Sequence, residues 1–596
     1  MVEAYEDDTE EGNDALEVRF DGLGVSTGVA IGPAHVIERG LIDVPEYGLA
    51  AHEVEPEVKR FEDAVALSAK QLRKLRGKAG ALPGAAAEEL SYLLDAHLQM
   101  LKGSRLVRGV AERIRSQSVN AEAAVQAELV EIGQAFAEVS DRYLASRIDD
   151  VREVGSRIIR NLSRVPYQAF SSLPQGAIII AEEITPADTA LMDPARVGGF
   201  GSALGGAEGH TAIMARSLGL PAVLGVPNLI TAVRSGDLVI VDGTRGRIVI
   251  NPTPETVGRY ERRREAEQRR QRQLERLKGI AAVTRDGGRI GLQCNLELPT
   301  ELPLAHAAGA EGIGLLRSEF LYMNRDRPPG EEEQYRTLRT IVEGMGGHPV
   351  TVRTLDLGSD KLAYSVGDHI SPSVNPALGL RAIRLSLKVR ALLDAQLGAM
   401  LRASAHGPVR ILLPMITTAA EVKAVREAVQ AVARRLARAR VPFSEPLPPI
   451  GVMIETPGAA LAADALAQVS DFFSLGTNDL TMYTLAIDRG DEQVAHLYDP
   501  LHPAVLRLIQ FATAAARRAR IPVNLCGEMA GNPRYTTLLL GLGLRDLSMA
   551  APSLPRVKQR ILDIDLAEAE RRAEQIMQQS DPGVIAALLD DFNALS

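Results

Sequence analysis

The stretch Ile450-Gly451-Val452-Met453-Ile454-Glu455-Thr456-Pro457 sets the pattern for the second half of this 596-residue chain, because a short apolar run ends there in a charged residue. Similar runs recur at 289–295, 312–317, 350–355, 409–416, 450–455, 472–475, 523–526 and 547–549. Ala-, Leu- and Arg-rich segments with helical character separate them. Strands that alternate with helices in this number predict a (β/α)8 barrel.

Charged residues follow several of these runs, and in such a barrel the chemistry lies at the carboxyl ends of the strands. Arg317, Arg353 and Arg489 are expected on that face, with Arg381 as a further candidate. A guanidinium offers a planar fork of donors that suits phosphate and carboxylate. Any single arginine could instead form a surface salt bridge, but several at strand ends favour a small substrate that carries both groups.

Two carboxylates are predicted to lie close together, since Glu455 and Asp479 end neighbouring strands. Mg²⁺ takes one or two protein carboxylates and completes its octahedron with water and substrate phosphate. An acid–base pair and a purely structural role are the alternatives.

The two cysteines of the chain have different contexts. Cys526 follows the run 523–526, where a thiol can act as an acid or a nucleophile, although a buried cysteine is more often a small apolar residue. Cys294 has no such setting and is interpreted as structural.

The first half changes pattern twice. Strand-like runs at 18–39 and 176–250 flank a segment from about 53 to 163 with apolar residues at helical spacing. The flanking strands are expected to form one domain with a bundle of about four helices inserted in it.

A Gly-rich turn precedes His210 in Gly205-Gly206-Ala207-Glu208-Gly209-His210-Thr211. A lone histidine is usually structural, but this one stands at a predicted helix N-terminus, where backbone N–H groups favour a phosphate. Imidazole is also a good nucleophile near neutral pH.

The composition is that of a globular protein, with 46% hydrophobic residues and a net charge of −9. The acidic balance and the 4% aromatic content do not indicate a nucleic-acid partner, and the mixed-charge tract at 255–278 is interpreted as a solvated helix. No run is long and apolar enough to predict a membrane span, and two cysteines suit a reducing cytoplasm. Residues 1–17 hold eight acids and no base, which predicts a disordered tail.

Together these motifs resemble phosphoenolpyruvate–protein phosphotransferase, Enzyme I of the bacterial sugar phosphotransferase system. The segments that carry the resemblance are the one around His210, Leu316–Met323, Val352–Asp356, Asn375–Arg384, Glu455-Thr456-Pro457, Gly476–Gly490 and Cys526-Gly527-Glu528.

The resemblance implies a multidomain α/β fold, in which a swivelling phosphohistidine domain with an inserted helical bundle precedes a TIM barrel. It implies these bounds: tail 1–17, phosphohistidine domain 18–45 and 165–250, helical carrier-binding domain 46–164, linker helix 251–280, barrel 281–575 and C-terminal helical tail 576–596.

The resemblance also implies a reaction. Phosphoenolpyruvate would be bound by Arg317, Arg353, Arg381, Asn478, Asp479 and Arg489, with Mg²⁺ on Glu455 and Asp479. His210 would take the phosphoryl group, Cys526 would protonate the enolate to give pyruvate, and a histidine of the carrier protein HPr would receive the phosphoryl group. The family also implies a homodimer.

Four positions depart from the family pattern, Gly209, Ser359, Leu380 and Met482, and none of them removes a charged or reacting group. The alternatives are a nitrogen-branch paralogue, a pyruvate phosphate dikinase-like enzyme and a non-catalytic descendant. A dikinase would need a large ATP-binding domain, for which the first 170 residues offer no phosphate-binding loop.

Overall fold

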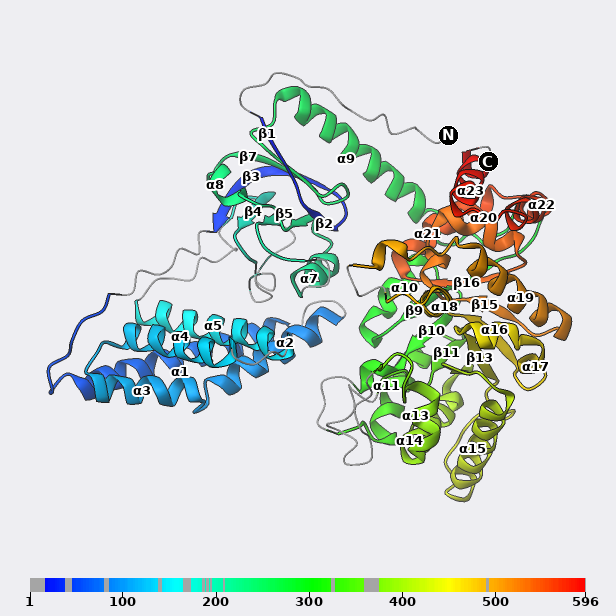
Figure 1. Ribbon diagram of the computed structural model, residues 1–596, viewed down its shortest axis with the longest axis horizontal. Helices are drawn as coiled ribbons and strands as arrows, with labels where there is room; N and C mark the ends of the chain where they lie inside the picture. Colours follow the sequence, from blue (N-terminus) through cyan, green and yellow to red (C-terminus); the bar gives the residue numbers. More distant parts are fainter. Residues whose placement is uncertain are drawn as a thin grey trace. The chain divides into compact units, whose positions relative to one another are not determined.

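The computed structural model describes residues 17–37, 45–79, 85–137, 142–163, 173–184, 188, 192, 196–206, 210–322, 327–358, 375–488 and 493–594. The chain divides into two compact units, and the boundary between them in the sequence lies at residues 269 and 270. Figure 1 shows the helical and strand-rich parts of both units. None of the described helices is long and apolar enough to cross a membrane.

The N-terminal unit combines a helical bundle with a sheet. The bundle holds α1 (Val54–Ala79), α2 (Ala85–Met100), α3 (Arg105–Gln117), α4 (Ala121–Ala137) and α5 (Arg142–Leu162), so the described residues contain five helices where about four were expected. Apolar residues at helical spacing, such as Phe61, Leu72, Leu94 and Ile158, fill its core.

The sheet is built from strands on both sides of the bundle in the sequence. They are β1 (Val18–Asp21), β2 (Leu23–Ser26), β3 (Val29–Ile37), β4 (Ala177–Ala181), β5 (Val197–Ser202), β6 (Ala222–Leu224), β7 (Leu238–Asp242) and β8 (Arg247–Ile250). Their order is β1-β8-β7-β3-β4-β5-β6-β2. Since β3 pairs with both β4 and β7, the helices α1–α5 are an insertion into one α/β domain.

Helix α9 (Pro254–Glu275) leaves this sheet, and Tyr260 packs with Ile240 and Val249 while Arg263 pairs with Asp242 at 2.7 Å. The side chains from 264 to 273 are mostly exposed, as expected of a solvated linker helix.

The C-terminal unit is a closed barrel of parallel strands, as predicted. Its strands are β9 (Gly291–Leu296), β10 (Ile313–Arg317), β11 (Val350–Arg353), β12 (Val409–Leu413), β13 (Ile450–Ile454), β14 (Phe472–Leu475), β15 (Val523–Leu525) and β16 (Asp546–Met549), and β16 pairs with β9 to close the ring. Each predicted run corresponds to one strand within a few residues. The fold class is confirmed.

Helices surround this barrel (Figure 1). They are α10 (Leu302–Ala308), α11 (Glu331–Gly344), α13 (Ala382–Lys388), α14 (Arg390–Ala403), α15 (Ala419–Arg438), α16 (Pro457–Leu461), α17 (Ala463–Ala467), α18 (Thr477–Leu485), α19 (Pro503–Ala519), α20 (Pro533–Gly541), α21 (Leu554–Leu562), α22 (Leu566–Met577) and α23 (Pro582–Ala594). Side-chain caps mark the start of some of them. At α15, for example, Glu421 N–H donates to the Thr418 hydroxyl and Thr418 N–H donates to the Glu421 carboxylate, which is a capping box.

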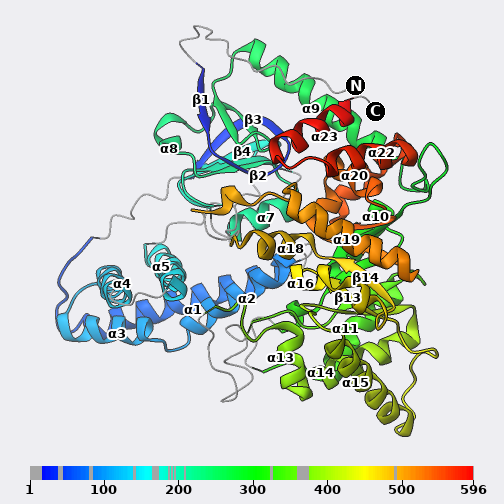
Figure 2. The ribbon, with the colours of Figure 1, turned by 45° about the vertical axis from the view of Figure 1, so that its right-hand side comes forward.

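The C-terminal helix α23 packs beside α20 and α22, as Figure 2 shows. Ile585, Leu589 and Phe592 join the core that lies between the barrel strands and their helices. The boundary expected between 575 and 576 falls inside α22, and the final segment packs as part of the barrel unit.

Candidate active site

Two arginines stand side by side at the carboxyl ends of β10 and β11, where Arg317 and Arg353 are register partners. Arg317 Nη1 donates to Glu297 at 2.7 Å. Arg353 is buried; it donates to Glu319, and its Nη1 lies 3.0 Å from Asp356. Each guanidinium is therefore held by a carboxylate at the mouth of the barrel.

Arg381, the residue that precedes α13, also lies at the mouth of the barrel. Its Nη2 donates to Asp356 at 2.8 Å and its Nη1 to the Tyr483 hydroxyl at 3.3 Å. The buried Nε atoms of Arg353 and Arg381, and Glu319 Oε2, have no hydrogen-bond partner among the described residues. Buried polar atoms are rarely left unpaired, so the two Nε–H groups are spare donors for an anionic ligand, whereas Glu319 Oε2 is a spare acceptor.

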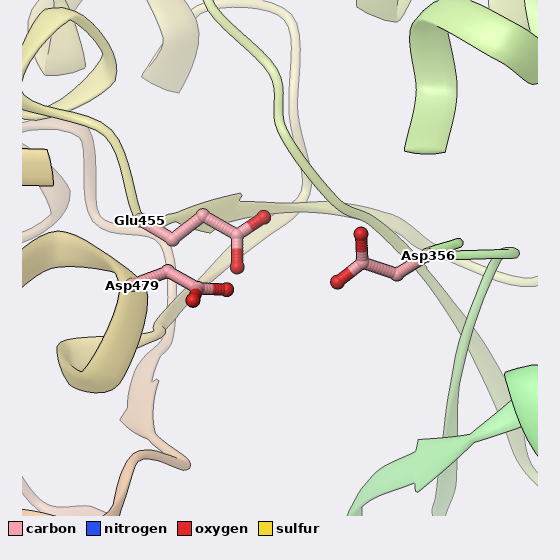
Figure 3. A group of neighbouring side chains, drawn as sticks. All are labelled: Asp356, Glu455 and Asp479. Atoms are coloured by element: carbon pink, nitrogen blue, oxygen red, sulfur yellow. The ribbon is translucent and has the colours of Figure 1, made fainter. Parts of the chain in front are cut away.

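Three carboxylates gather beside these arginines. Figure 3 shows Glu455 and Asp479 next to each other, with Asp356 facing them. One oxygen from each of the three lies within 4.8 Å of the others. Glu455 is 1% exposed, and its Oε1 accepts a 2.5 Å hydrogen bond from the backbone N–H of Met415. Met415 has a φ of 55°, a left-handed conformation that residues other than glycine seldom adopt.

The pKa values of two of these carboxylates are shifted in opposite directions. Burial raises the pKa of Glu455 well above its usual value, and the neighbouring Asp356 and Asp479 raise it further. Burial also acts to raise the pKa of Asp356, but Arg353 and Arg381 outweigh it, so that pKa lies below its usual value. A cation bound among these oxygens would relieve the repulsion that Glu455 experiences.

Strand register brings Glu455 to Asp479. Ile454 of β13 pairs with Leu475 of β14, so the chain leaves both strands at the same level. A Cβ on Gly476 would lie 3.0 Å from Cβ of Glu455, which is tighter than ordinary contacts. Glycine at this position leaves room for the Glu455 side chain next to the start of α18, whose first turn carries Asp479.

Cys526 follows β15 and is 4% exposed. Burial raises the pKa of its thiol to about 11. Glu528, two residues further on, is hydrogen-bonded to Asn478 in the first turn of α18. Asn478 Nδ2 donates to the Glu528 carboxylate and the Glu528 N–H donates to Asn478 Oδ1, both at 2.8 Å. A Cβ on Gly527 would lie 1.9 Å from Thr477 Oγ1, so only glycine permits this approach.

His210 lies in the N-terminal unit, where α7 (His210–Leu218) begins, as the sequence predicted. Its side chain is outside the described residues. Thr211 Oγ1 donates to the backbone oxygen of Ile184 at 2.5 Å. Ala212 and Ala215 pack in the core of the sheet and Met214 in the core of the bundle, so α7 is held between the two.

Comparison with known proteins agrees with this layout. Models of the PEP-utilising enzymes match residues 21–147 (N-terminal), 173–246 (mobile domain) and 271–566 (PEP-binding domain). A phosphoenolpyruvate-protein phosphotransferase of Cupriavidus necator is 42% identical over 95% of this chain and 98% of its own length. This chain belongs to the phosphoenolpyruvate-protein phosphotransferase family. Members from Bacillus sp. (39% identical, 95% of this chain and 96% of theirs) and Haemophilus influenzae (36%, 96% and 99%) are similarly close.

Family membership confirms the resemblance seen in the sequence. Among the described residues, the barrel brings Arg317, Arg353, Arg381, Glu455, Asn478, Asp479 and Cys526 to the carboxyl ends of its strands. Arg489, like Gly209 and Ser359, lies outside the described residues. Cys294 belongs to the core between strands and helices, where burial raises its pKa to about 12.

Two further residues lie at this site and were not predicted from the sequence, Asp356 and Glu319. Each follows a strand-end arginine by two or three positions, and each pairs with Arg353. An acid just beyond a strand-end arginine was the available signal. Residues close to the ends of barrel strands share one rim, so such an acid has an arginine within reach.

Proposed function

We propose that this chain transfers the phosphoryl group of phosphoenolpyruvate to His210 and then to a histidine of a small carrier protein of the HPr type, releasing pyruvate. One observation carries the proposal. A chain of this family brings three arginines, each paired with a carboxylate, to the barrel mouth beside a cluster of three carboxylates.

Substrate binding falls to the arginines. Phosphoenolpyruvate carries a phosphate and a carboxylate, and Arg317, Arg353 and Arg381 offer forked donors to both. Their present partners are carboxylates of the protein, which an anionic substrate can replace or share. Asn478, Asp479 and Arg489 complete the proposed set.

The carboxylates suit a divalent cation of the Mg²⁺ type. Glu455 and Asp479 would hold it, because two carboxylates with open positions for water and phosphate match its preference. The raised pKa of Glu455, caused by burial and then by its acidic neighbours, fits a site completed by positive charge. When bound, the ion neutralises charge on the phosphate oxygens.

Two residues of the chain carry the bond changes. A ring nitrogen of His210 attacks phosphorus, the bond from phosphorus to the bridging oxygen breaks, and its electron pair passes to the enolate of pyruvate. Cys526 then gives its thiol proton to the C3 carbon, which yields pyruvate and a thiolate. Because His210 and the barrel belong to different units, the reaction requires them to meet, and α9 is the proposed hinge.

Labelled phosphoenolpyruvate tests the proposal. Incubation with Mg²⁺ and without ATP should place acid-labile, base-stable label on the protein. His210→Ala should lose the label and retain substrate binding, because the barrel arginines hold the substrate. His348→Ala is the matched control, an exposed histidine on the barrel unit that should keep full labelling. Label that survives in His210→Ala, or a need for ATP, would contradict the proposal.

The carrier is proposed to dock on the helical bundle, and the enzyme to act in the cytoplasm as a homodimer through its barrel unit. These proposals rest on the family alone. Light scattering of the full chain with Mg²⁺ and phosphoenolpyruvate should give the mass of two chains. A one-chain mass at micromolar concentration would refute the dimer.

A further inference from the structure

Strands β14 and β15 place their residues on two opposite faces. Phe473, Leu475, Val523 and Leu525 belong to the core between the barrel strands and the outer helices. Phe472 and Cys526 belong instead to a small cluster with Leu315, Leu412 and Met453. Side chains alternate along a strand, so Ser474 shares the face of Phe472 and Cys526. That face is the interior of the barrel.

Ser474 is fully buried there, and its hydroxyl donates to the thiol of Cys526 at 3.2 Å. The thiol lies 3.6 Å from the backbone oxygen of Leu475, to which it donates. Ser474 thus supplies a hydrogen bond to the sulfur, while the sulfur keeps its own proton directed elsewhere.

The backbone of Cys526 is held from the other side. Asn295 Nδ2 donates to the carbonyl oxygen of Cys526 at 2.9 Å, and the Ser548 hydroxyl donates to Asn295 Oδ1 at 2.6 Å. Asn295 lies in β9 and Ser548 in β16, so with Ser474 of β14 three different strands hold this one residue. The backbone of residue 526 is therefore fixed, while its sulfur interacts with Ser474.

We infer that Ser474 is a positioning residue, which fixes the Cys526 thiol at the barrel mouth and stabilises the thiolate left when that thiol gives its proton to enolpyruvate. The inference rests on the proposed function, which assigns the proton transfer to Cys526.

The chemistry of the step explains why a donor is needed. The S–H bond breaks, a C–H bond forms at C3, and the negative charge moves from the enolate to sulfur. Burial opposes that charge and raises the pKa of Cys526, whereas the hydrogen bond from Ser474 lowers it. Arg353 and Arg317 also favour the thiolate, and Glu455 opposes it. Ser474 is the neutral donor in this set, and it bonds to sulfur directly.

Three measurements on Ser474→Ala test the inference: pyruvate formation from phosphoenolpyruvate, exchange of pyruvate methyl protons with deuterated water, and phosphoryl exchange between the phosphorylated enzyme and its carrier. The first two need proton transfer at C3 and should slow about tenfold or more, since a hydrogen bond to a charged group is lost. Carrier exchange needs no enolate and should stay within about twofold of the parent.

The pH profile separates positioning from packing. The rising limb of methyl-proton exchange should move to higher pH in Ser474→Ala, because the pKa of the thiol rises when the donor is removed. Ser474→Thr keeps a hydroxyl and should leave that limb where the parent has it. Ser470→Ala is the matched control: it removes a buried hydroxyl that donates to Leu466 O at 2.6 Å, and should change none of the rates.

Two results would overturn the inference. One is methyl-proton exchange in folded Ser474→Ala that keeps the parent's rate and pH profile. The other is a loss in which all three rates fall together with the melting temperature and the pH limb does not move. Failure of the proposed function would look different, because the parent chain would then form no pyruvate from phosphoenolpyruvate.

Discussion

Two networks of arginine and glutamate or aspartate lie in different units of the chain, and they differ in how completely they are paired. In the bundle, Arg60 donates through Nε and both Nη atoms to Glu57 and Glu122, and through Nη1 to the backbone oxygen of Leu162. Glu57 also accepts from the N–H of Ala121. No buried polar atom of Arg60, Glu57 or Glu122 lacks a partner in the described structure.

At the barrel mouth, some polar atoms of the same residue types have no hydrogen-bond partner in the described part of the chain. The Nε atoms of Arg353 and Arg381 and one oxygen of Glu319 have no partner among the described residues. One oxygen from each of three carboxylates also lies within 4.8 Å of the others at the mouth, and the pKa of Glu455 is raised there by burial and then by Asp356 and Asp479. The difference lies in the combination: at the mouth, unpaired arginine atoms stand next to a group of three carboxylates in a chain of this family, whereas the Arg60 network is fully paired and has no such neighbours within the described structure.

Arg353→Met gives the largest expected effect. It removes a proposed substrate contact and leaves Glu319 and Asp356 facing the mouth without this partner. We expect pyruvate formation to fall by about 10³-fold or more, while phosphoryl exchange with the carrier stays near the parental rate. Arg402→Met is the control, because Arg402 pairs with Glu331 and Glu332 on helices outside the barrel. Equal losses in both variants would show that the mouth network is structural.

Asp356→Asn should have a smaller effect on the same reaction. The amide cannot hold both Arg353 and Arg381 by charge, so the two guanidiniums lose their shared anchor. We expect a loss of about 10- to 100-fold in kcat/KM for phosphoenolpyruvate, with the fold intact. Asp394→Asn, a change on α14 outside this network, is the control. An unchanged kcat/KM would place Asp356 outside the catalytic arrangement.

Arg60→Met tests the other network and should act on stability. It leaves Glu57 and Glu122 without their cation, and breaking such a pair costs about 3–5 kcal/mol when it is buried. Because the Arg60 side chain is 36% exposed, solvent screens the loss, and we expect about 2 kcal/mol in the free energy of unfolding of the N-terminal unit. The free energy of unfolding can be measured by chemical denaturation, with a spectroscopic label on the helical bundle as the reporter. A matching loss of pyruvate formation under native conditions would break the comparison.

The bundle network should also respond to acid. Burial acts to raise the pKa of Glu122, but its hydrogen bonds, led by Arg60, outweigh that and hold the pKa below the usual 4.5. A lowered folded-state pKa contributes stability above the unfolded value, which is lost as pH falls through the folded pKa. We therefore expect the melting temperature of the bundle to drop as pH falls below about 4.5, and less so in Glu122→Gln. Identical acid profiles would contradict the assignment.

The sequence predicted much of this molecule for identifiable reasons. The barrel strands were visible because each apolar run is buried on at least one face, and the polar or charged residues near their ends mark the catalytic rim. The start of α7 at His210 followed from its Gly-rich turn. Glu455 and Asp479 were expected to meet because neighbouring parallel strands end at the same level.

Tertiary structure decided what lies between those points. Asp356 pairs with Arg353 at the end of β11 and with Arg381, which precedes α13 and lies 25 positions further along the chain. Only the fold brings these two arginines to the same carboxylate. In the sequence Ser474 is one small residue in an apolar run, and the pairing of β14 with β15 places it beside the thiol of Cys526. Sequence periodicity determines which face a residue occupies. The contacts that side chains make between strands depend on strand pairing and register, which local sequence does not encode.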